Sequence, residues 1–149
     1  MVRYLLDTDV VSEVLRSEPD PQVEARLRGC RGDAALPSVV WHELVEAAGR
    51  MPPGSRRSQL AAFLLDVVVP SFPVVPYDRE AATWHARQRA DPSGSATAEA
   101  SAPGMADGMV AAVAAVHGLV LVTADPSRYS SFPGVSVERW HGRPGRSRG

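Results

Sequence analysis

Lysine, asparagine and isoleucine are absent from this chain of 149 residues, and cysteine occurs once. The single Cys30 excludes an internal disulfide, and no pair of cysteines or histidines has the spacing of a zinc site. No run approaches the roughly 18 consecutive apolar residues that a membrane helix needs, and the amino terminus lacks the charged and apolar regions of a secretory signal. We therefore expect a soluble, cytoplasmic protein with no membrane segment.

All sixteen basic residues are arginine, and they are unevenly distributed. Because four of them fall in the last eleven residues, residues 1–138 carry 12 arginines against 17 acids. The net charge of the whole chain is only −1, so bulk charge neither favours nor excludes nucleic acid as a partner. The length fits one domain, which we expect over residues 1–140, followed by a disordered basic tail over residues 141–149.

Apolar runs alternate with segments of helical spacing along the chain. The patterns predict strands at 2–6, 34–36, 74–75, 119–123 and 135–137. They predict helices near 9–16, 20–29, 39–50, 55–68, 77–90 and 105–117, with Ser38 as the cap of the third. Strands separated by helices favour an α/β fold with a mainly parallel sheet that is covered on both faces. The polar segment 91–104 is expected to form a mobile loop.

A carboxylate directly follows two of the predicted strands. Asp7 comes after the strand at 2–6, and Asp125 comes after the strand at 119–123. In a parallel sheet ligands bind beyond the carboxyl ends of the strands, so both acids are candidates for metal or phosphate chemistry. Each also has an ordinary structural explanation, Asp7 as a helix cap and Asp125, which precedes a proline, as the start of a turn.

Two more carboxylates occupy apolar faces of predicted helices. Glu43 lies on or beside the stripe that contains Val40 and Leu44, and Asp107 shares a face with Val110. A carboxylate that faces a core costs on the order of several kcal/mol unless it is paired or binds metal, although Asp107 can also simply complement the helix dipole. Because no lysine is present to neutralise these acids, their pattern predicts a cation with a preference for oxygen ligands, Mg²⁺ or Mn²⁺.

Four runs resemble, in this order, the motifs of PIN-domain ribonucleases, and most closely those of VapC toxins: LLDTDVVSEVL, VVWHELVEAAGR, MADGMVAAVAAVHG and LVLVTADPSRY. The resemblance extends from Tyr4 to about Trp140 and implies a PIN-like α/β/α sandwich. Asp9 stands where the family usually has asparagine, and the segment 91–104 is longer and less basic than the usual connection. Carried over by position, the resemblance implies a catalytic quartet with two supporting hydroxyls: Asp7, Glu43, Asp107 and Asp125, with Thr8 and Thr123.

The resemblance implies a metal-dependent endoribonuclease that acts as the toxin of a VapBC-type toxin–antitoxin pair. A divalent ion lowers the pKa of the attacking water and offsets the charge of the phosphate. Asp7, Asp107 and Asp125 are the expected ligands of Mg²⁺ or Mn²⁺, and Glu43 is expected to ligate or orient a second ion or the attacking water. RNA, a VapB-like antitoxin and a second copy of the chain are the implied partners. The antitoxin is expected to cover apolar positions of two helical segments: Val11, Val14, Leu15, Leu60 and Leu64.

Two alternatives stay open. The order Asp7, Thr8, Asp9 after an apolar strand also fits a haloacid-dehalogenase-like phosphatase with Asp7 as the nucleophile, but that family needs a downstream lysine, which this chain lacks. The second alternative is a catalytically silent PIN-like binding module, against which the intact quartet argues. The isolated histidines His85, His117 and His141 are expected at the surface or at an edge of the fold.

Overall fold

One parallel sheet forms the centre of the molecule. The computed structural model describes residues 1–91 and 104–142, and its five strands are ordered β3-β2-β1-β4-β5 with every neighbouring pair parallel. The predicted α/β class with a parallel sheet is confirmed. The strands are β1 (Tyr4–Leu6), β2 (Ala34–Pro37), β3 (Val74–Val75), β4 (Val120–Val122) and β5 (Val137–Glu138).

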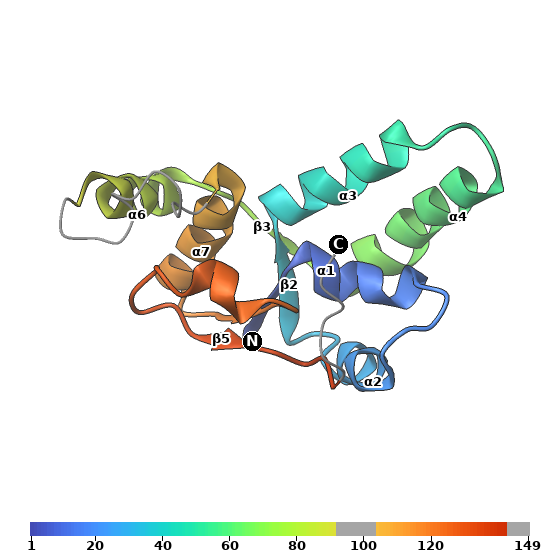
Figure 1. Ribbon diagram of the computed structural model, residues 1–149, viewed down its shortest axis with the longest axis horizontal. Coiled ribbons are helices and arrows are strands. Elements are labelled where there is room, and N and C mark those ends of the chain that lie inside the picture. The colour runs from blue at the N-terminus through green and yellow to red at the C-terminus, as the bar shows by residue number, and fades with distance from the viewer. Residues whose placement is uncertain (92–103, 143–149) are drawn as a thin grey trace.

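Helices cover both faces of this sheet. Figure 1 shows α6 and α7 on one side of the sheet and α1, α2 and α4 on the other. The α-helices are α1 (Thr8–Val11), α2 (Pro21–Gly29), α3 (Ser38–Arg50), α4 (Ser55–Phe63), α5 (Val69–Ser71), α6 (Arg79–Ala90) and α7 (Met105–His117). The other helical elements of the described residues are two short 3-10 helices, η1 (Ser12–Leu15) and η4 (Pro126–Tyr129), and a π-helical turn, η2 (Leu64–Val68).

The central strands are buried on both faces, as the α/β/α layering requires. Leu5 and Leu6 of β1 and Leu121 and Val122 of β4 have no exposed surface, which explains why these strands are uninterrupted apolar runs rather than alternating ones. Since all strands are parallel, the carboxyl ends of β1, β2 and β4 lie at the same edge of the sheet. The chain continues there into α1, α3 and the turn that precedes η4.

Several boundaries differ from the predicted ones. The helix predicted at 9–16 is α1 followed by η1, and the helix predicted at 55–68 changes to a π-helical turn at Leu64. Ser38 does not cap α3, because the helix begins at this residue with Pro37 as its cap. The Ser38 hydroxyl instead accepts the backbone N–H of Tyr77 at 3.2 Å, so it attaches the segment after β3 to the start of α3.

Helices α6 and α7 pack through an unusually close contact between a histidine and a glycine. His85 is only 2% exposed, so the expectation of a surface histidine is wrong. Its Nδ1 lies 3.0 Å from the hydroxyl of Tyr77. A Cβ atom at Gly108 would lie 2.0 Å from His85 Nε2, so only glycine allows the imidazole to lie this close to the first turns of α7.

The segment after β5 continues along α2 before the described part ends. His141 Nε2 lies 3.2 Å from a carboxylate oxygen of Glu13, and the N–H of Gly142 donates to Asp20 at 3.0 Å. The predicted mobile loop falls almost entirely outside the described residues, and so does the predicted tail beyond residue 142. None of the helices in the described ranges has both the length and the apolar character needed to cross a membrane.

Candidate active site

Asp7 is the buried centre of the candidate site. It follows β1 directly and is 2% exposed. Its Oδ1 accepts the N–H of Thr8 at 2.8 Å and so caps α1, while its Oδ2 accepts the hydroxyl of Tyr129 at 2.7 Å. Asp7 can therefore cap α1 and belong to the candidate site at the same time, since Oδ1 contacts Thr8 and Oδ2 contacts Tyr129.

Asp107 and Asp7 both contact the guanidinium of Arg128. Asp107 lies in the first turn of α7, and its Oδ1 accepts a hydrogen bond from Nη2 of Arg128. Nη1 of the same guanidinium lies 3.5 Å from Asp7 Oδ2. Burial lowers the pKa of Arg128, but the hydrogen bond to Asp107 and the charge of Asp7 outweigh it and raise that pKa above its ordinary value. The structure thus brings two predicted metal ligands to a single positive charge.

Glu43 reaches the site through Thr8. The Thr8 hydroxyl donates to Glu43 Oε2 at 2.5 Å, which links the start of α1 to the second turn of α3. Glu43 is half-buried, whereas Glu46 one turn later is exposed and pairs with Arg50. Of these two acids, only Glu43 is therefore turned toward the start of α1. The hydroxyl of Thr8 orients the carboxylate of Glu43.

Asp125 lies at the same edge of the sheet but makes different contacts. It is exposed, and its Oδ1 accepts the backbone N–H of Ser127 at 3.2 Å and also the Ser127 hydroxyl, so it caps η4. The fully buried Thr123 accepts the N–H of Asp125 at 3.3 Å. Across residues 1–91 and 104–142, no three acidic, histidine or cysteine side chains lie close enough together to hold a metal ion. The role of Asp125 as a ligand stays a prediction.

Asp9 contributes a further carboxylate beside Asp7. Its Oδ2 accepts the N–H of Ala124 at 3.1 Å and the hydroxyl of Thr123 at 3.4 Å. Its Oδ1 is buried and has no hydrogen-bond partner among the described residues. Burial, together with the charge of Asp7, raises the pKa of Asp9 to about 6. A buried oxygen without a donor is what a cation or an ordered water would satisfy.

The donor set fits a small divalent ion in its chemistry. Magnesium is usually held by one or two carboxylates and keeps several waters, and Asp7 and Asp107 already share one cation. Because no third acidic side chain of the described residues lies close enough to join them, waters would supply the remaining ligands. In the structure, the carboxylates of Asp7 and Asp107 both contact Arg128.

Sequence reasoning did not single out Arg128 and Tyr129, although both lie in the fourth motif. Tyr129 is 1% exposed, and burial together with the neighbouring Asp7 carboxylate raises the pKa of its hydroxyl above the ordinary value. It therefore stays protonated and donates to Asp7. The sequence did contain a hint of their role. Because the chain has no lysine, an arginine must pair with its acids, and Arg128 and Tyr129 follow Asp125 within one turn.

The fold agrees with the comparisons. The family model named PIN domain matches residues 4–131. The chain is 32% identical over 139 residues to VapC ribonuclease Y4jK of Sinorhizobium fredii, an alignment that covers 91% of this chain and 96% of that protein. This chain therefore belongs to the PIN domain family.

Solved structures give the same result. The crystal structure of FitAcB from Neisseria gonorrhoeae superposes with a TM-score of 0.78 at 29% identity and covers 90% of this chain and 95% of that chain. VapBC-5 from Mycobacterium tuberculosis, a member of the VapBC family of toxin-antitoxin systems, superposes with a TM-score of 0.64 at 25% identity, covering 95% of this chain and 99% of that one.

Proposed function

We propose that this chain is a metal-dependent endoribonuclease that acts in the cytoplasm as the toxin of a VapBC-type toxin–antitoxin pair. The observation that carries the proposal is the meeting of Asp7 and Asp107 at one cation, beyond the carboxyl ends of parallel strands, in a PIN domain. The ribonuclease name of its relative Y4jK supports the reaction class. The toxin–antitoxin description of VapBC-5 supports the biological setting.

The residues of the site have separable tasks in this proposal. Asp7, Asp107 and Asp125 would hold Mg²⁺ or Mn²⁺, which supplies activation of water and neutralisation of phosphate charge when bound. Thr8 keeps Glu43 oriented so that the carboxylate can accept a hydrogen bond from the attacking water. Tyr129 fixes the rotamer of Asp7 by donating to Oδ2. The Oδ1 of Asp125 caps η4, so Asp125 would join the others through Oδ2.

The nature of the products tests the reaction. Purified protein is incubated with a defined RNA and Mg²⁺, and the ends of the products are sequenced. We expect internal cuts that leave 5′-phosphate and 3′-hydroxyl ends, as hydrolysis by metal-activated water produces. Turnover of p-nitrophenyl phosphate without RNA cleavage would instead support the phosphatase alternative. Inertness toward both substrates would support the silent binding module.

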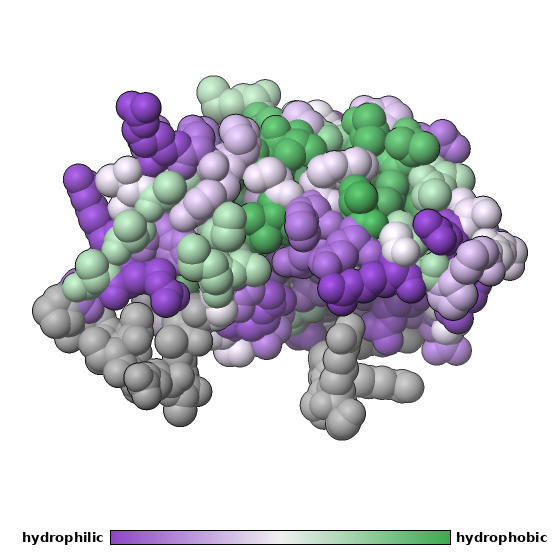
Figure 2. All heavy atoms as spheres, turned by 90° about the horizontal axis from the view of Figure 1, so that it is seen from above, coloured by the Kyte–Doolittle hydropathy of each residue, from purple (hydrophilic) through white to green (hydrophobic). Residues whose placement is uncertain are grey.

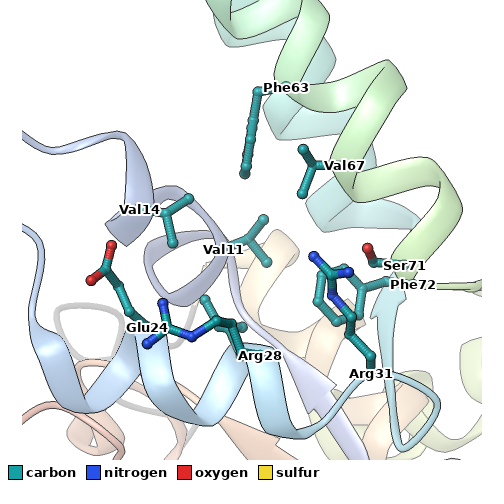
Figure 3. Close-up of a pocket in the computed structure, with 10 residues that line it drawn as sticks. Val11, Val14, Glu24, Arg28, Arg31, Phe63, Val67, Ser71 and Phe72 are labelled. Atoms are coloured by element: carbon teal, nitrogen blue, oxygen red, sulfur yellow. The ribbon is translucent and has the colours of Figure 1, made fainter.

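An apolar hollow on the side of α2 offers a place for the antitoxin. Figure 3 shows Val11 and Val14 facing Phe63 and Val67 across this hollow. Figure 2 shows that strongly hydrophobic residues also gather toward the half of the upper face that carries α3 and α4. Of the positions predicted for the partner, Val11 and Val14 do line the hollow. Val11 is 1% exposed and belongs to the core, as do Leu60 and Leu64 at 7% and 5%, and neither of these two leucines lines the hollow, so their assignment to it is wrong.

We propose that an amphipathic helix of a VapB-like antitoxin binds in this hollow. One side of the hollow is charged, since Glu24, Arg28 and Arg31 line it along and just after α2. Apolar side chains of the antitoxin helix would pack against the valines and phenylalanines of the hollow. Charged side chains on its polar face would pair with Glu24, Arg28 and Arg31. We further propose, from the family resemblance, that the toxin itself is a homodimer.

Co-expression with the product of the neighbouring gene is expected to give a stable complex without ribonuclease activity. Val67→Arg should abolish the complex and leave RNA cleavage by the free toxin unchanged, because Val67 is 38% exposed and lines the hollow. Val74→Arg is the matched control, an exposed valine on β3 outside the hollow, and should bind normally. Binding that survives Val67→Arg would contradict the placement of the antitoxin in the hollow.

The proposed homodimer has its own test. Light scattering of the toxin alone should give twice its mass of 15.9 kDa.

A further inference from the structure

The candidate site already contains a cation from its own chain. Arg128 lies on η4, and its two terminal nitrogens contact different carboxylates, Nη2 that of Asp107 and Nη1 that of Asp7. Its guanidinium carbon also lies 5.5 Å from the centre of the Tyr129 ring. A planar guanidinium spans two acids in this way because its donors are fixed in a fork. The two carboxylates are therefore partly neutralised by the protein itself.

The arginine contacts Asp7 Oδ2 and Asp107 Oδ1, so a metal ion that used these two atoms would compete with it. A carboxylate oxygen has two lone-pair sites, and Asp7 Oδ2 already accepts from the Tyr129 hydroxyl while lying 3.5 Å from Arg128. The other oxygen, Oδ1, is committed in part to the N–H of Thr8. A divalent ion that bridges Asp7 and Asp107 would thus occupy the place where the guanidinium now lies. Repulsion between the two cations adds to this competition.

Exposure shows which partner is free to move. The side chain of Asp7 is 3% exposed and that of Asp107 22%, whereas that of Arg128 is 37% exposed. The acids are held by buried elements, β1 and α7, while the arginine is carried by a four-residue turn. An arginine whose stem already lies partly in water can leave the pair without unpacking the core.

We propose that Arg128 is a resident counter-ion that competes with the divalent ion for Asp7 and Asp107, so that metal binds only as the guanidinium leaves. The inference rests on the proposed function, because it takes these carboxylates as metal ligands. It assigns Arg128 a definite effect on the reaction. The arginine holds the acids together in the metal-free chain and raises the metal concentration at which the site fills.

Binding of Mn²⁺ to the full-length protein, followed by the electron paramagnetic resonance signal of the free ion, tests this without any RNA. Arg128→Gln should bind Mn²⁺ about tenfold more tightly than the wild type, since a charge-assisted contact no longer has to break. Arg128→Lys, which keeps the charge and loses the fork, should fall between them. Arg50→Gln is the matched control, an exposed arginine paired with Glu46, and should match the wild type.

Unchanged or weaker Mn²⁺ binding by Arg128→Gln would overturn the inference. If a variant fails to fold, nuclear magnetic resonance of the wild type gives a second test. The Nε–H resonance of Arg128 should move to the position of a solvated arginine as Mg²⁺ saturates the protein. A resonance that does not move would also overturn the inference. Asp7→Asn locates the ion. If binding depends on Asp7 but not on Arg128, the inference fails and the nuclease proposal stands. If Asp7→Asn leaves binding unaltered, both fail.

Discussion

RNA cleavage by Asp7→Asn is expected to fall at least about a hundredfold below the wild type, as when a single group that stabilises a transition state is removed. The amide keeps the shape of the carboxylate and its Oδ1 can still cap α1, so the fold should be retained. What is lost is the negative charge that would hold the metal. Asp66→Asn, an exposed acid on η2, is the matched control and should cleave at the wild-type rate. Full activity of Asp7→Asn would remove Asp7 from the mechanism.

The same variant should be less stable without metal, although repulsion among clustered acids alone predicts the opposite. In the structure Asp7 accepts from Tyr129 and pairs with Arg128. In Asp7→Asn, the amide N–H₂ group would face the Tyr129 hydroxyl or the Arg128 guanidinium, which are themselves hydrogen-bond donors. We expect a loss of roughly 1–2 kcal/mol, a fall of about 2–8 °C in melting temperature for a chain of this size. Circular dichroism melts in EDTA measure it, and a higher melting temperature would show that repulsion dominates.

Gly108→Ala is expected to give the largest loss of stability, about 3 kcal/mol, because its new methyl group would lie 2.0 Å from His85 Nε2. The imidazole is 2% exposed and is held by Tyr77, so it cannot move aside without unpacking α6 from α7. Activity should fall in parallel, since Asp107 precedes this residue in the first turn of α7. Thermal melts and RNA cleavage rates together measure both effects.

A matched glycine and a compensating change separate the clash from a general effect of alanine. Gly49 lies on α3, and a methyl group added there would have no neighbouring atom within 4 Å, so Gly49→Ala should stabilise the protein by about 0.5–1 kcal/mol. His85→Ala combined with Gly108→Ala should regain part of the stability lost by Gly108→Ala alone. A melting temperature of Gly108→Ala equal to that of the wild type would show that the contact is not close in solution.

Local pattern sufficed to predict most of the elements, and it singled out Asp7 and Asp107. Apolar runs of strand length indicated the positions of β1 and β4, and their parallel order follows from the helices between them. Asp7 could be identified because a carboxylate directly after a buried strand lies where parallel strands end. Asp107 could be identified because an acid on the face of an apolar helix requires a partner.

The partners of these acids could not be predicted, because they depend on distant segments that only the folded chain brings together. Arg128 and Tyr129 belong to a short turn whose direction is fixed by packing rather than by periodicity. Asp125, two residues before Ser127, satisfies that turn, which is the ordinary role of the aspartate in Asp-Pro. His85 looked isolated in sequence because the glycine that accommodates it lies on another helix.

We propose that Asp7 and Asp107 hold a divalent ion that this chain uses to cut RNA. The most direct measurement is the initial rate of cleavage of one labelled RNA by wild type and Asp107→Asn, first in EDTA and then with increasing Mg²⁺ or Mn²⁺. We predict no cleavage in EDTA, recovery with metal for the wild type, and at least about a hundredfold less activity for Asp107→Asn at every metal concentration. Wild-type cleavage that persists in EDTA, or an Asp107→Asn variant as active as the wild type, would contradict the claim.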